Sequence, residues 1–275
     1  MLKFIFACLF FQVQGLILEL PEELADNAVM FSEARIVGGV DAPEGRIPYQ
    51  ASLRSWYNSH FCGGSVINNR WILTAAHCTA GQSKYGMSVV LGTINRLSGG
   101  VKYSVDRIII HKKYDSSSIK NDISLIKVDK EIQFNDLVQP IQLPDADTGE
   151  GVELLLSGWG RISYPGSLPV HLQMINLTSV SFEECKTIYN NINPVFNTQI
   201  CSLTKYGEGA CHGDSGGPLV SGKNIVGIVS WGMPCAKGYP DVYTRVYSFK
   251  DWILKTIEEN DYEYPAPQRI VFPKN

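Results

Sequence analysis

The chain has 275 residues, of which 44% are hydrophobic and 19% are charged, and its formal net charge at pH 7 is −3. This balance is typical of a globular protein, and the length suits one large domain or two closely packed ones. Residues 1–15 carry one positive charge and residues 16–35 carry five acids against one arginine, so residues 36–275 have no net charge. A neutral body gives no reason to expect nucleic acid or an anionic membrane as a partner.

The N-terminal stretch has the pattern of a secretory signal peptide. Lys3 is followed by an apolar run from Phe4 to Phe11 and then by a short segment ending at Gly15. A buried strand or a membrane anchor is the alternative, but the run is too short to span a bilayer. The sequence therefore predicts a signal peptide at residues 1–15 and a secreted, extracellular protein that does not span a membrane.

The rest of the chain favours β-strands over helices. Short runs rich in β-forming residues, such as Ser88–Leu91 and Val105–Ile110, alternate with turns, and no helical period is sustained. Residues 139–151 contain two prolines, two glycines and several acids, which is typical of a connector between two β regions.

One helix is predicted near the end, at about residues 248–260. Ser248 is a candidate N-cap, and Phe249, Trp252 and Ile253 fall on one face at helical spacing. The segment 261–275 contains three prolines and is expected to be irregular.

The cysteines indicate disulfides. Seven are present, and one of them, Cys8, leaves with the signal peptide. An even set in an exported protein predicts three disulfides, although the sequence alone does not fix which cysteines pair. A zinc site is the alternative, but the cysteines lack C-x-x-C spacing. The remaining six are Cys62, Cys78, Cys185, Cys201, Cys211 and Cys235.

Three motifs suggest the chemistry. Residues 36–39 read Ile-Val-Gly-Gly, residues 74–78 read Thr-Ala-Ala-His-Cys, and residues 213–218 read Gly-Asp-Ser-Gly-Gly-Pro. A serine hydroxyl is a poor nucleophile until a base removes its proton, and flanking glycines let a substrate backbone approach.

A histidine and an aspartate complete the set. His77 offers the base, and Asp122, in an apolar strand-like run, offers a carboxylate. The order His77, Asp122, Ser215, together with the three motifs, resembles the chymotrypsin-type serine proteases over residues 35 to about 260.

The resemblance implies an all-β fold of two tandem six-stranded antiparallel Greek-key barrels with a C-terminal α-helix. Barrel one would span about residues 36–138 and barrel two about residues 151–246. The same resemblance selects the disulfide pairs Cys62–Cys78, Cys185–Cys201 and Cys211–Cys235.

It also implies the activity, a secreted digestive or tissue-degrading endopeptidase. Ser215 would attack the peptide carbonyl, His77 would take its proton, Asp122 would orient His77, and the N–H groups of Gly213 and Ser215 would bind the oxyanion. Proteins and peptides would be the substrates, protein inhibitors would be further partners, and a monomer is expected. The alternative is a non-catalytic homologue that acts as a binding or regulatory protein.

The segment 16–35 has the composition of an activation peptide. It is acidic, has no cysteine and ends at Arg35, so an activating protease that prefers basic residues would cut there. In the family the new ammonium, here at Ile36, pairs with the aspartate before the nucleophile, here Asp214. Ser52 and His60 match the positions that hold this aspartate before cleavage, although a surface hydroxyl and a strand-end imidazole are the alternative interpretation.

The family's specificity pocket would include Gly209, Ser230, Gly232 and Asp241. Trypsin-like members carry aspartate where this chain has Gly209, and most members have glycine where this chain has Asp241. The arrangement is similar to that of the collagenolytic, broad-specificity proteases of crustaceans and some insects.

The charge state of Asp241 leaves the specificity open. A carboxylate in a confined pocket is costly unless it is paired. A substrate Lys or Arg could pair with it, whereas Lys237 could neutralise it and leave an apolar slot for Phe, Tyr or Leu. We expect mixed or chymotrypsin-like specificity, with strictly trypsin-like specificity as the alternative.

The sequence also bears on glycosylation and metal binding. Asn176-Leu177-Thr178 is an acceptor sequence for N-glycosylation. Residues 79–100, where many relatives bind calcium, contain no Asp or Glu. Hard cations need oxygen ligands, so we expect no calcium there, and we expect no other metal and no cofactor.

Overall fold

The structure is a computed structural model that describes residues 36–163, 165–203, 205–233 and 235–261. The predicted signal peptide, the predicted activation peptide with Arg35, and the tail beyond Asp261 lie outside these residues. In the described part of the chain, no helix is both long and apolar enough to cross a membrane.

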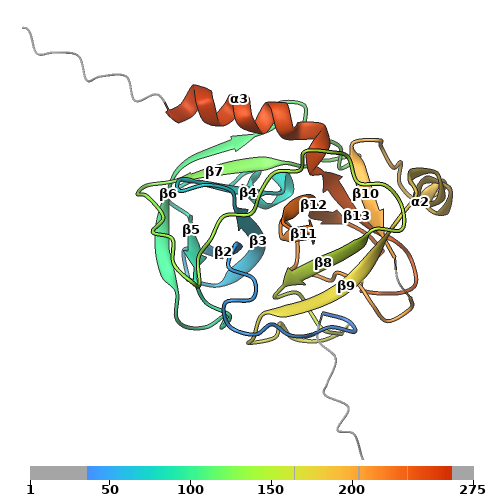
Figure 1. Ribbon diagram of the computed structural model, residues 1–275, viewed down its shortest axis with the longest axis horizontal. Coiled ribbons are helices and arrows are strands. Elements are labelled where there is room, and N and C mark those ends of the chain that lie inside the picture. Colours follow the sequence, from blue (N-terminus) through green and yellow to red (C-terminus); the bar gives the residue numbers. More distant parts are fainter. Residues whose placement is uncertain (1–35, 164, 204, 234, 262–275) are drawn as a thin grey trace, which may run out of the picture. The chain divides into compact units, whose positions relative to one another are not determined.

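Six antiparallel strands close the first barrel in the order β2-β3-β4-β7-β6-β5, coloured blue to green in Figure 1. The bounds are β2 Gln50–Ser55, β3 His60–Val66, β4 Trp71–Thr74, β5 Met87–Leu91, β6 Val101–Ile110 and β7 Ser124–Val128. Every residue of β4, β5 and β7 is buried, and each of these strands contains β-branched residues, which favour strands. The predicted strands at 88–91 and 105–110 lie within β5 and β6.

The second barrel follows the order β9-β10-β13-β12-β11-β8 and is closed by pairing of β8 with β9. The bounds are β8 Glu153–Gly158, β9 Gln173–Val180, β10 Gln199–Ser202, β11 Pro218–Ser221, β12 Asn224–Trp231 and β13 Asp241–Arg245. A short strand, β1 (Val40–Asp41), pairs with the start of β9 at Gln173 and Met174, whereas β10 pairs with the end of β9 at Ser179 and Val180. The expected fold class, two closed six-stranded barrels with a C-terminal helix, is confirmed.

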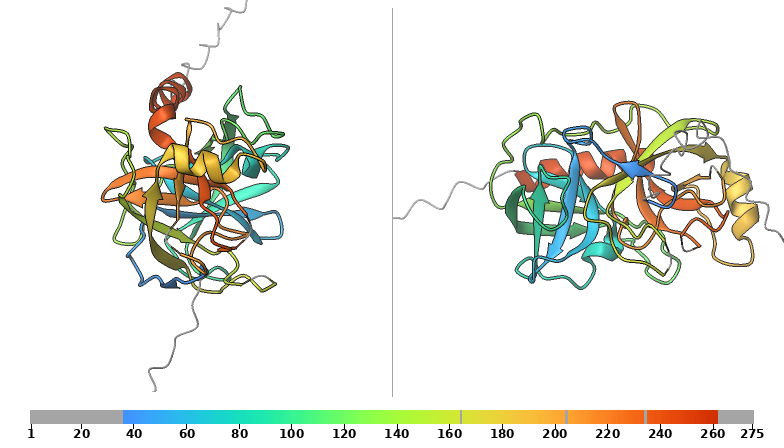
Figure 2. Two further views of the ribbon diagram at one scale, coloured as in Figure 1. Left: turned by 90° about the vertical axis from the view of Figure 1, so that its right-hand side faces the viewer. Right: turned by 90° about the horizontal axis from the view of Figure 1, so that it is seen from below.

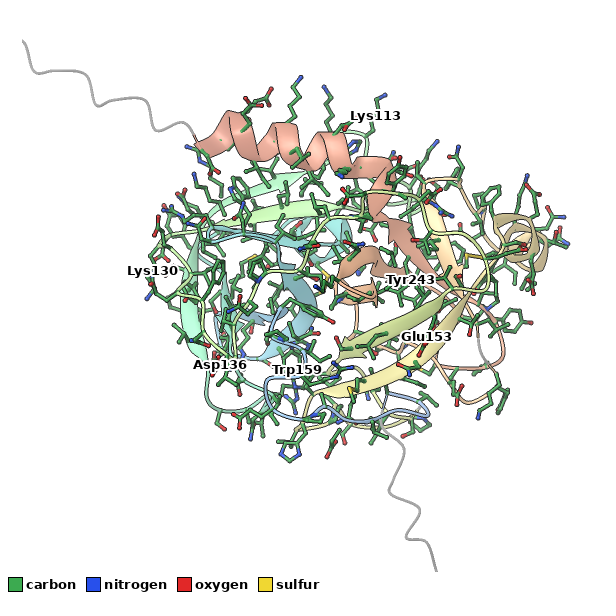
Figure 3. The ribbon with its side chains drawn as sticks, viewed as in Figure 1. Lys113, Lys130, Asp136, Glu153, Trp159 and Tyr243 are labelled. Atoms are coloured by element: carbon green, nitrogen blue, oxygen red, sulfur yellow. A yellow bond between two sulfur atoms is a disulfide. The ribbon has the colours of Figure 1, made fainter. Side chains whose placement is uncertain are left out.

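Large side chains lie in the barrel interiors, and many charged side chains lie at the surface. Tyr243 has no exposed surface and Trp159 is 1% exposed, whereas Glu153 and Lys130 are exposed at the surface (Figure 3). This separation is the ordinary consequence of burying apolar area.

The two barrels meet closely at the loop that carries Ser215. The Gly63 N–H donates to the Ser215 carbonyl at 2.7 Å, and the Ser157 hydroxyl donates to Gln50 Oε1 at 2.7 Å. A Cβ on Gly63 would come within 2.7 Å of Gly217 Cα, so glycine permits this approach. The contacts place the loop at 213–217 against the first barrel.

The C-terminal helix α3 (Lys250–Asp261) covers one side of barrel one (Figures 1 and 2). Ser248 does not begin it, because a 3₁₀ turn occupies Val246–Phe249 and the α-helix starts after that turn. Trp71 Nε1 donates to Asp261 at 2.9 Å, and Lys127 Nζ donates to the Asn260 carbonyl at 2.7 Å. These bonds fix the last turn of the helix on the barrel.

A second helix, α2 (Phe182–Tyr189), was not predicted. The Ser181 hydroxyl accepts from the Glu184 N–H at its start, which is the Ser-x-x-Glu capping pattern. The helix has only 8 residues, too few for sequence periodicity to reveal it, whereas the capping pattern could have.

Candidate active site

His77 and Asp122 are brought together by neighbouring elements of barrel one. The short helix α1 (Ala76–Thr79) follows β4 and carries His77, while Asp122 lies just before β7, which pairs with β4. His77 Nδ1 lies 2.7 Å from Asp122 Oδ2, and the His77 backbone N–H donates to Oδ1 at 2.8 Å. Both carboxylate oxygens therefore orient one histidine, and the proton on Nδ1 leaves Nε2 free to accept.

Asp122 is itself fixed from the second barrel. Its side chain is 1% exposed, and the Ser230 hydroxyl donates to its Oδ2 at 2.6 Å. The Thr244 hydroxyl donates to the Asp122 carbonyl at 2.6 Å. From the sequence, Ser230 was predicted only as a pocket residue. The structure places it along the pocket and also in contact with the candidate triad. No sequence motif indicated the contact of Thr244.

Ser215 lies in the adjoining loop with a free hydroxyl. No hydrogen bond of 3.5 Å or less joins its Oγ to His77 in the described structure, where His77 Nε2 lies 3.7 Å from Cys78 Sγ. Such bonds are often long in enzymes without substrate and tighten in the complex. The His77 side chain is 28% exposed, so a substrate can reach it.

Two backbone N–H groups of this loop point to no protein acceptor. Within the described residues, Asp214, Gly216 and Gly217 donate to carbonyls, but Gly213 and Ser215 do not. Gly213 has φ of +107°, a region that strongly favours glycine, and a Cβ there would meet Leu168 at 2.8 Å. Two unpaired donors beside a serine can bind a developing oxyanion.

Asp214 holds this loop from inside the protein. It has no exposed surface, and its two carboxylate oxygens accept from the N–H groups of Gly160, at 2.7 Å, and Cys211, at 2.9 Å. Burial raises the pKa of Asp214 to about 6, and the two N–H donors oppose that rise. Among the described residues, no basic nitrogen lies within 4.0 Å of it in an ion pair.

Ile36 is buried in the same barrel. It has no exposed surface and lies in an apolar cluster with Leu154, Leu156 and Ala210. Val37 forms a β-bridge with Gly209, which ties the segment after Ile36 to the loop before Ser215. In the full chain Ile36 follows Arg35, so its nitrogen is part of a peptide bond and carries no free ammonium.

Ser52 and His60 contact each other and not Asp214. The Ser52 hydroxyl lies 2.9 Å from His60 Nδ1, and His60 Nε2 lies 3.1 Å from the Gly213 carbonyl oxygen. Burial lowers the pKa of His60 to about 4, so this imidazole is neutral over the physiological range. Neither residue is the surface group of the alternative interpretation, since His60 is 5% exposed and Ser52 has no exposed surface.

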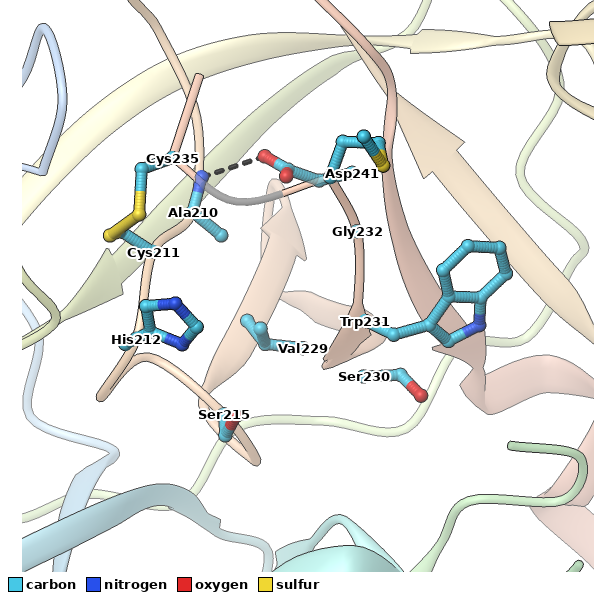
Figure 4. Close-up of a pocket in the computed structure, with 11 residues that line it drawn as sticks. Ala210, Cys211, His212, Ser215, Val229, Ser230, Trp231, Gly232, Cys235 and Asp241 are labelled. Atoms are coloured by element: carbon cyan, nitrogen blue, oxygen red, sulfur yellow. Dashed lines mark hydrogen bonds between the residues drawn. A yellow bond between two sulfur atoms is a disulfide. The ribbon is translucent and has the colours of Figure 1, made fainter. Parts of the chain in front are cut away.

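A cavity of about 240 Å³ opens beside Ser215 (Figure 4). It is formed by the loop before the serine, the end of β12 and the start of β13. The lining residues are Ala210, Cys211, His212, Ser215, Val229, Ser230, Trp231, Gly232, Met233, Cys235 and Asp241.

Asp241 lies across the cavity from Ser215 (Figure 4), and its Oδ2 accepts from the Ala210 N–H at 2.6 Å. Gly209 itself is absent from the lining residues. The Asp241 carboxylate occupies the space that a side chain at position 209 would need, and Gly209 has φ of +147°. An aspartate in this position at 241 therefore requires a glycine at 209.

Burial also controls the charge of Asp241. The residue is 7% exposed, and burial raises its pKa to about 8, with the Ala210 N–H opposing and the charge of Asp214 adding to the rise. Lys237 is exposed and makes no ion pair with it, so the neutralising pair considered from the sequence does not form. Burial therefore favours the protonated form of this carboxyl near neutral pH.

The six cysteines form the disulfides Cys62–Cys78, Cys185–Cys201 and Cys211–Cys235, as the resemblance implied. Sulfur atoms of the first pair lie near His77 in an arrangement that resembles a metal site. Sulfurs in a disulfide are not thiolates, so this group does not offer a zinc set. Asn176 lies on the exposed face of β9.

Comparison with known proteins agrees with this geometry. The family described as Trypsin matches residues 36–253. Chymotrypsin-2 of Vespa crabro is 49% identical over 221 residues, which cover 80% of this chain and 99% of that protein. Trypsin II-P29 of Gallus gallus is 43% identical over 81% of this chain and 89% of its own length. Trypsin 5G1 of Aedes aegypti is 40% identical over 81% of this chain and 85% of its own.

The family match covers both barrels, all three disulfides and every residue of the candidate active site. The relatives match over most of their own lengths as well as most of this chain. This chain belongs to the trypsin family and is a serine endopeptidase.

Proposed function

We propose that the chain is a secreted endopeptidase that uses Ser215, His77 and Asp122 as its catalytic triad. The observation that carries the proposal is the pair of hydrogen bonds that the Asp122 carboxylate accepts from His77, at 2.7 and 2.8 Å. It lies beside a serine loop with two unpaired N–H groups. Ser215 attacks the peptide carbonyl while His77 takes its proton, and the N–H groups of Gly213 and Ser215 stabilise the oxyanion.

His77 then returns the proton to the leaving amine. An acyl-enzyme on Ser215 remains, and water activated by the same histidine hydrolyses it. Asp122 keeps Nδ1 protonated throughout and stabilises the imidazolium ion that forms in each half of the reaction.

The proposal includes synthesis as a zymogen that an activating protease cuts after Arg35. Ile36 is fully buried in the apolar cluster of barrel two, the barrel that also contains the buried Asp214. A new ammonium at Ile36 would give Asp214 a cation, and a buried carboxylate without one is costly. Ile36 also has φ of +46°, which β-branched residues rarely adopt and which a chain end would not impose.

Arg35→Gln should prevent activation. A protease that requires a basic residue can no longer cut there, so treatment with immobilised trypsin should produce no peptidase activity. Arg107→Gln, which changes an exposed arginine on β6, is the matched control and should activate normally. Full peptidase activity from intact Arg35→Gln protein would show that no cut at this bond is needed.

For specificity we propose a mixed preference. With Asp241 protonated the pocket is a neutral slot lined by Val229, Met233 and Trp231 among others, which suits Phe, Tyr or Leu. A substrate Lys or Arg would bring a cation to the carboxyl and favour its ionised form. The pocket would thus accept both classes, as in the collagenolytic broad-specificity proteases.

Strictly trypsin-like cleavage is the second candidate, and the position of Asp241 at the end of the cavity favours it. Rates on matched Arg and Phe peptides separate the two, because a strict trypsin would cut only the former. Protein substrates follow from the family, and we propose secretion, regulation by protein inhibitors and glycosylation at Asn176.

A further inference from the structure

Arg54 is a buried cation with no matching anion. Its residue is 2% exposed, yet in the described part of the chain no carboxylate forms an ion pair with it. Its Nη2 atom is buried and has no hydrogen-bond partner. Burial and the charge of Arg96 both lower the pKa of Arg54, so its surroundings oppose its charge. An unpaired buried charge destabilises the folded state.

Strand pairing directs this cation toward two polar neighbours. Ser52 and Arg54 are two residues apart on β2 and so face the same side of the strand. In the antiparallel pairing of β2 with β3, Arg54 lies opposite His60, next to a register shift between Leu53 and Arg54. Such irregularities re-aim side chains, and here the side chains of Ser52, Arg54 and His60 converge.

The three side chains form one directed series of hydrogen bonds. Arg54 Nε donates to Ser52 Oγ at 3.2 Å, because a guanidinium can only donate. The Ser52 hydroxyl then has its own hydrogen for His60 Nδ1, at 2.9 Å. His60 Nε2 must carry a hydrogen, since its partner at 3.1 Å is a carbonyl oxygen, which can only accept.

The series ends on Gly213, one of the two residues whose N–H groups would bind the oxyanion. Its carbonyl oxygen is the acceptor for His60, so the series restrains the backbone on the C-terminal side of that glycine. Gly213 has φ of +107° and lies in a loop in which glycine at 216 also has positive φ. Such a backbone has few intrinsic restraints, so an external hydrogen bond matters more for its orientation.

We propose that Arg54 is a positioning residue for the oxyanion-binding loop, acting through Ser52 and His60 on the Gly213 peptide. The proposal rests on the catalytic role proposed above for Gly213 and Ser215. Arg54 fixes the direction of the Ser52 hydroxyl and, through it, the tautomer of His60. Its burial without an anion then has a functional reason, since an apolar residue of the same length would fold at lower cost.

Two substitutions distinguish the role of the Arg54 Nε donor from the role of its positive charge. Glutamine carries Nε2 at the same distance along its side chain as arginine carries Nε, so Arg54→Gln keeps a neutral donor for Ser52. Arg54→Met has the same reach and no donor. We expect Arg54→Met to lower kcat roughly tenfold with KM nearly unchanged, because the oxyanion site acts in the transition state. Arg54→Gln should recover most of that loss.

A second measurement does not depend on catalysis. Nitrogen-15 NMR of the five histidines should show His60 protonated at Nε2 in the parent protein and in Arg54→Gln. Arg54→Met should show a mixture of tautomers at His60. Its unfolding midpoint should be no lower than that of the parent, because the substitution removes an unpaired buried charge.

The proposal is wrong if Arg54→Met keeps full kcat and a single His60 tautomer, or if Arg54→Gln loses as much kcat as Arg54→Met. A slower Arg54→Met protein that is also much less stable would point to packing alone and equally contradict it. Failure of the proposed catalytic function would give a different result. A parent protein that shows no acylation burst would contradict the catalytic role of Ser215, whereas the comparison of His60 tautomers would still test the role of Arg54.

Discussion

Replacing Ser215 with alanine should lower kcat by roughly a million-fold, which is the scale seen when a triad nucleophile is removed. The hydroxyl makes no hydrogen bond to His77 in the described structure, and its loop is held by backbone bonds and by Asp214. The folded structure should therefore be retained. Hydrolysis of a peptide mixture by the activated protein, with the unfolding midpoint measured alongside, checks both parts.

The matched control is Ser116→Ala, which removes a hydroxyl from an exposed loop of barrel one. It should leave the rate unchanged. If Ser215→Ala retained more than a few per cent of the parent rate, another residue would be the nucleophile.

Asp241→Asn should lower kcat/KM for Arg and Lys substrates and leave Phe and Leu substrates similar or better. A lost charge pair in a partly desolvated pocket costs about 2–5 kcal/mol, or roughly 30-fold to several thousand-fold. Asparagine keeps a side-chain oxygen for the Ala210 N–H, which now donates to Asp241 at 2.6 Å. The comparison needs Arg and Phe peptides that differ only at the residue before the cut.

Asp241→Gly is the second arm of that experiment. It removes both the charge and the acceptor for Ala210, so an effect of lost support would appear on both substrate classes. Equal falls for Arg and Phe substrates in Asp241→Asn would show that the residue supports the pocket wall and does not recognise charge.

The ratio of kcat/KM for Arg over Phe substrates should rise as pH increases through about 8. Burial raises the pKa of Asp241 to about 8, so the empty pocket is neutral below that pH and anionic above it. A basic side chain gains an ion pair only with the anionic form, whereas Phe gains nothing. The Asp241→Asn protein should show a flat ratio, and a parent ratio that falls with pH would contradict the assignment.

The sequence predicted the fold and most of the candidate site because the three motifs sit at fixed points of a barrel pair. Local pattern alone was less informative. The helix α2 escaped because it is short, and Ser248 was taken as a cap although a 3₁₀ turn includes it. Long-range contacts were the hardest to foresee.

Three residues illustrate that limit. Ser230 contacts Asp122 from 108 residues away, Lys237 turns to solvent and leaves Asp241 unpaired, and Arg54 reaches Ser52 beside a strand irregularity. None of these three arrangements can be predicted from residue type or spacing alone. Each depends on how two strands or two barrels meet, which one sequence does not specify.

The measurement that most directly tests whether this chain is a Ser215-dependent endopeptidase is labelling with a fluorophosphonate, followed by mass spectrometry of the peptides. The protein would first be cut after Arg35 by immobilised trypsin, which is then removed. We predict a single adduct on Ser215 that is absent from the uncut chain and from a His77→Ala variant. An activated protein with no adduct on Ser215, or with its adduct on another residue, would contradict the proposed nucleophile and the mechanism built on it.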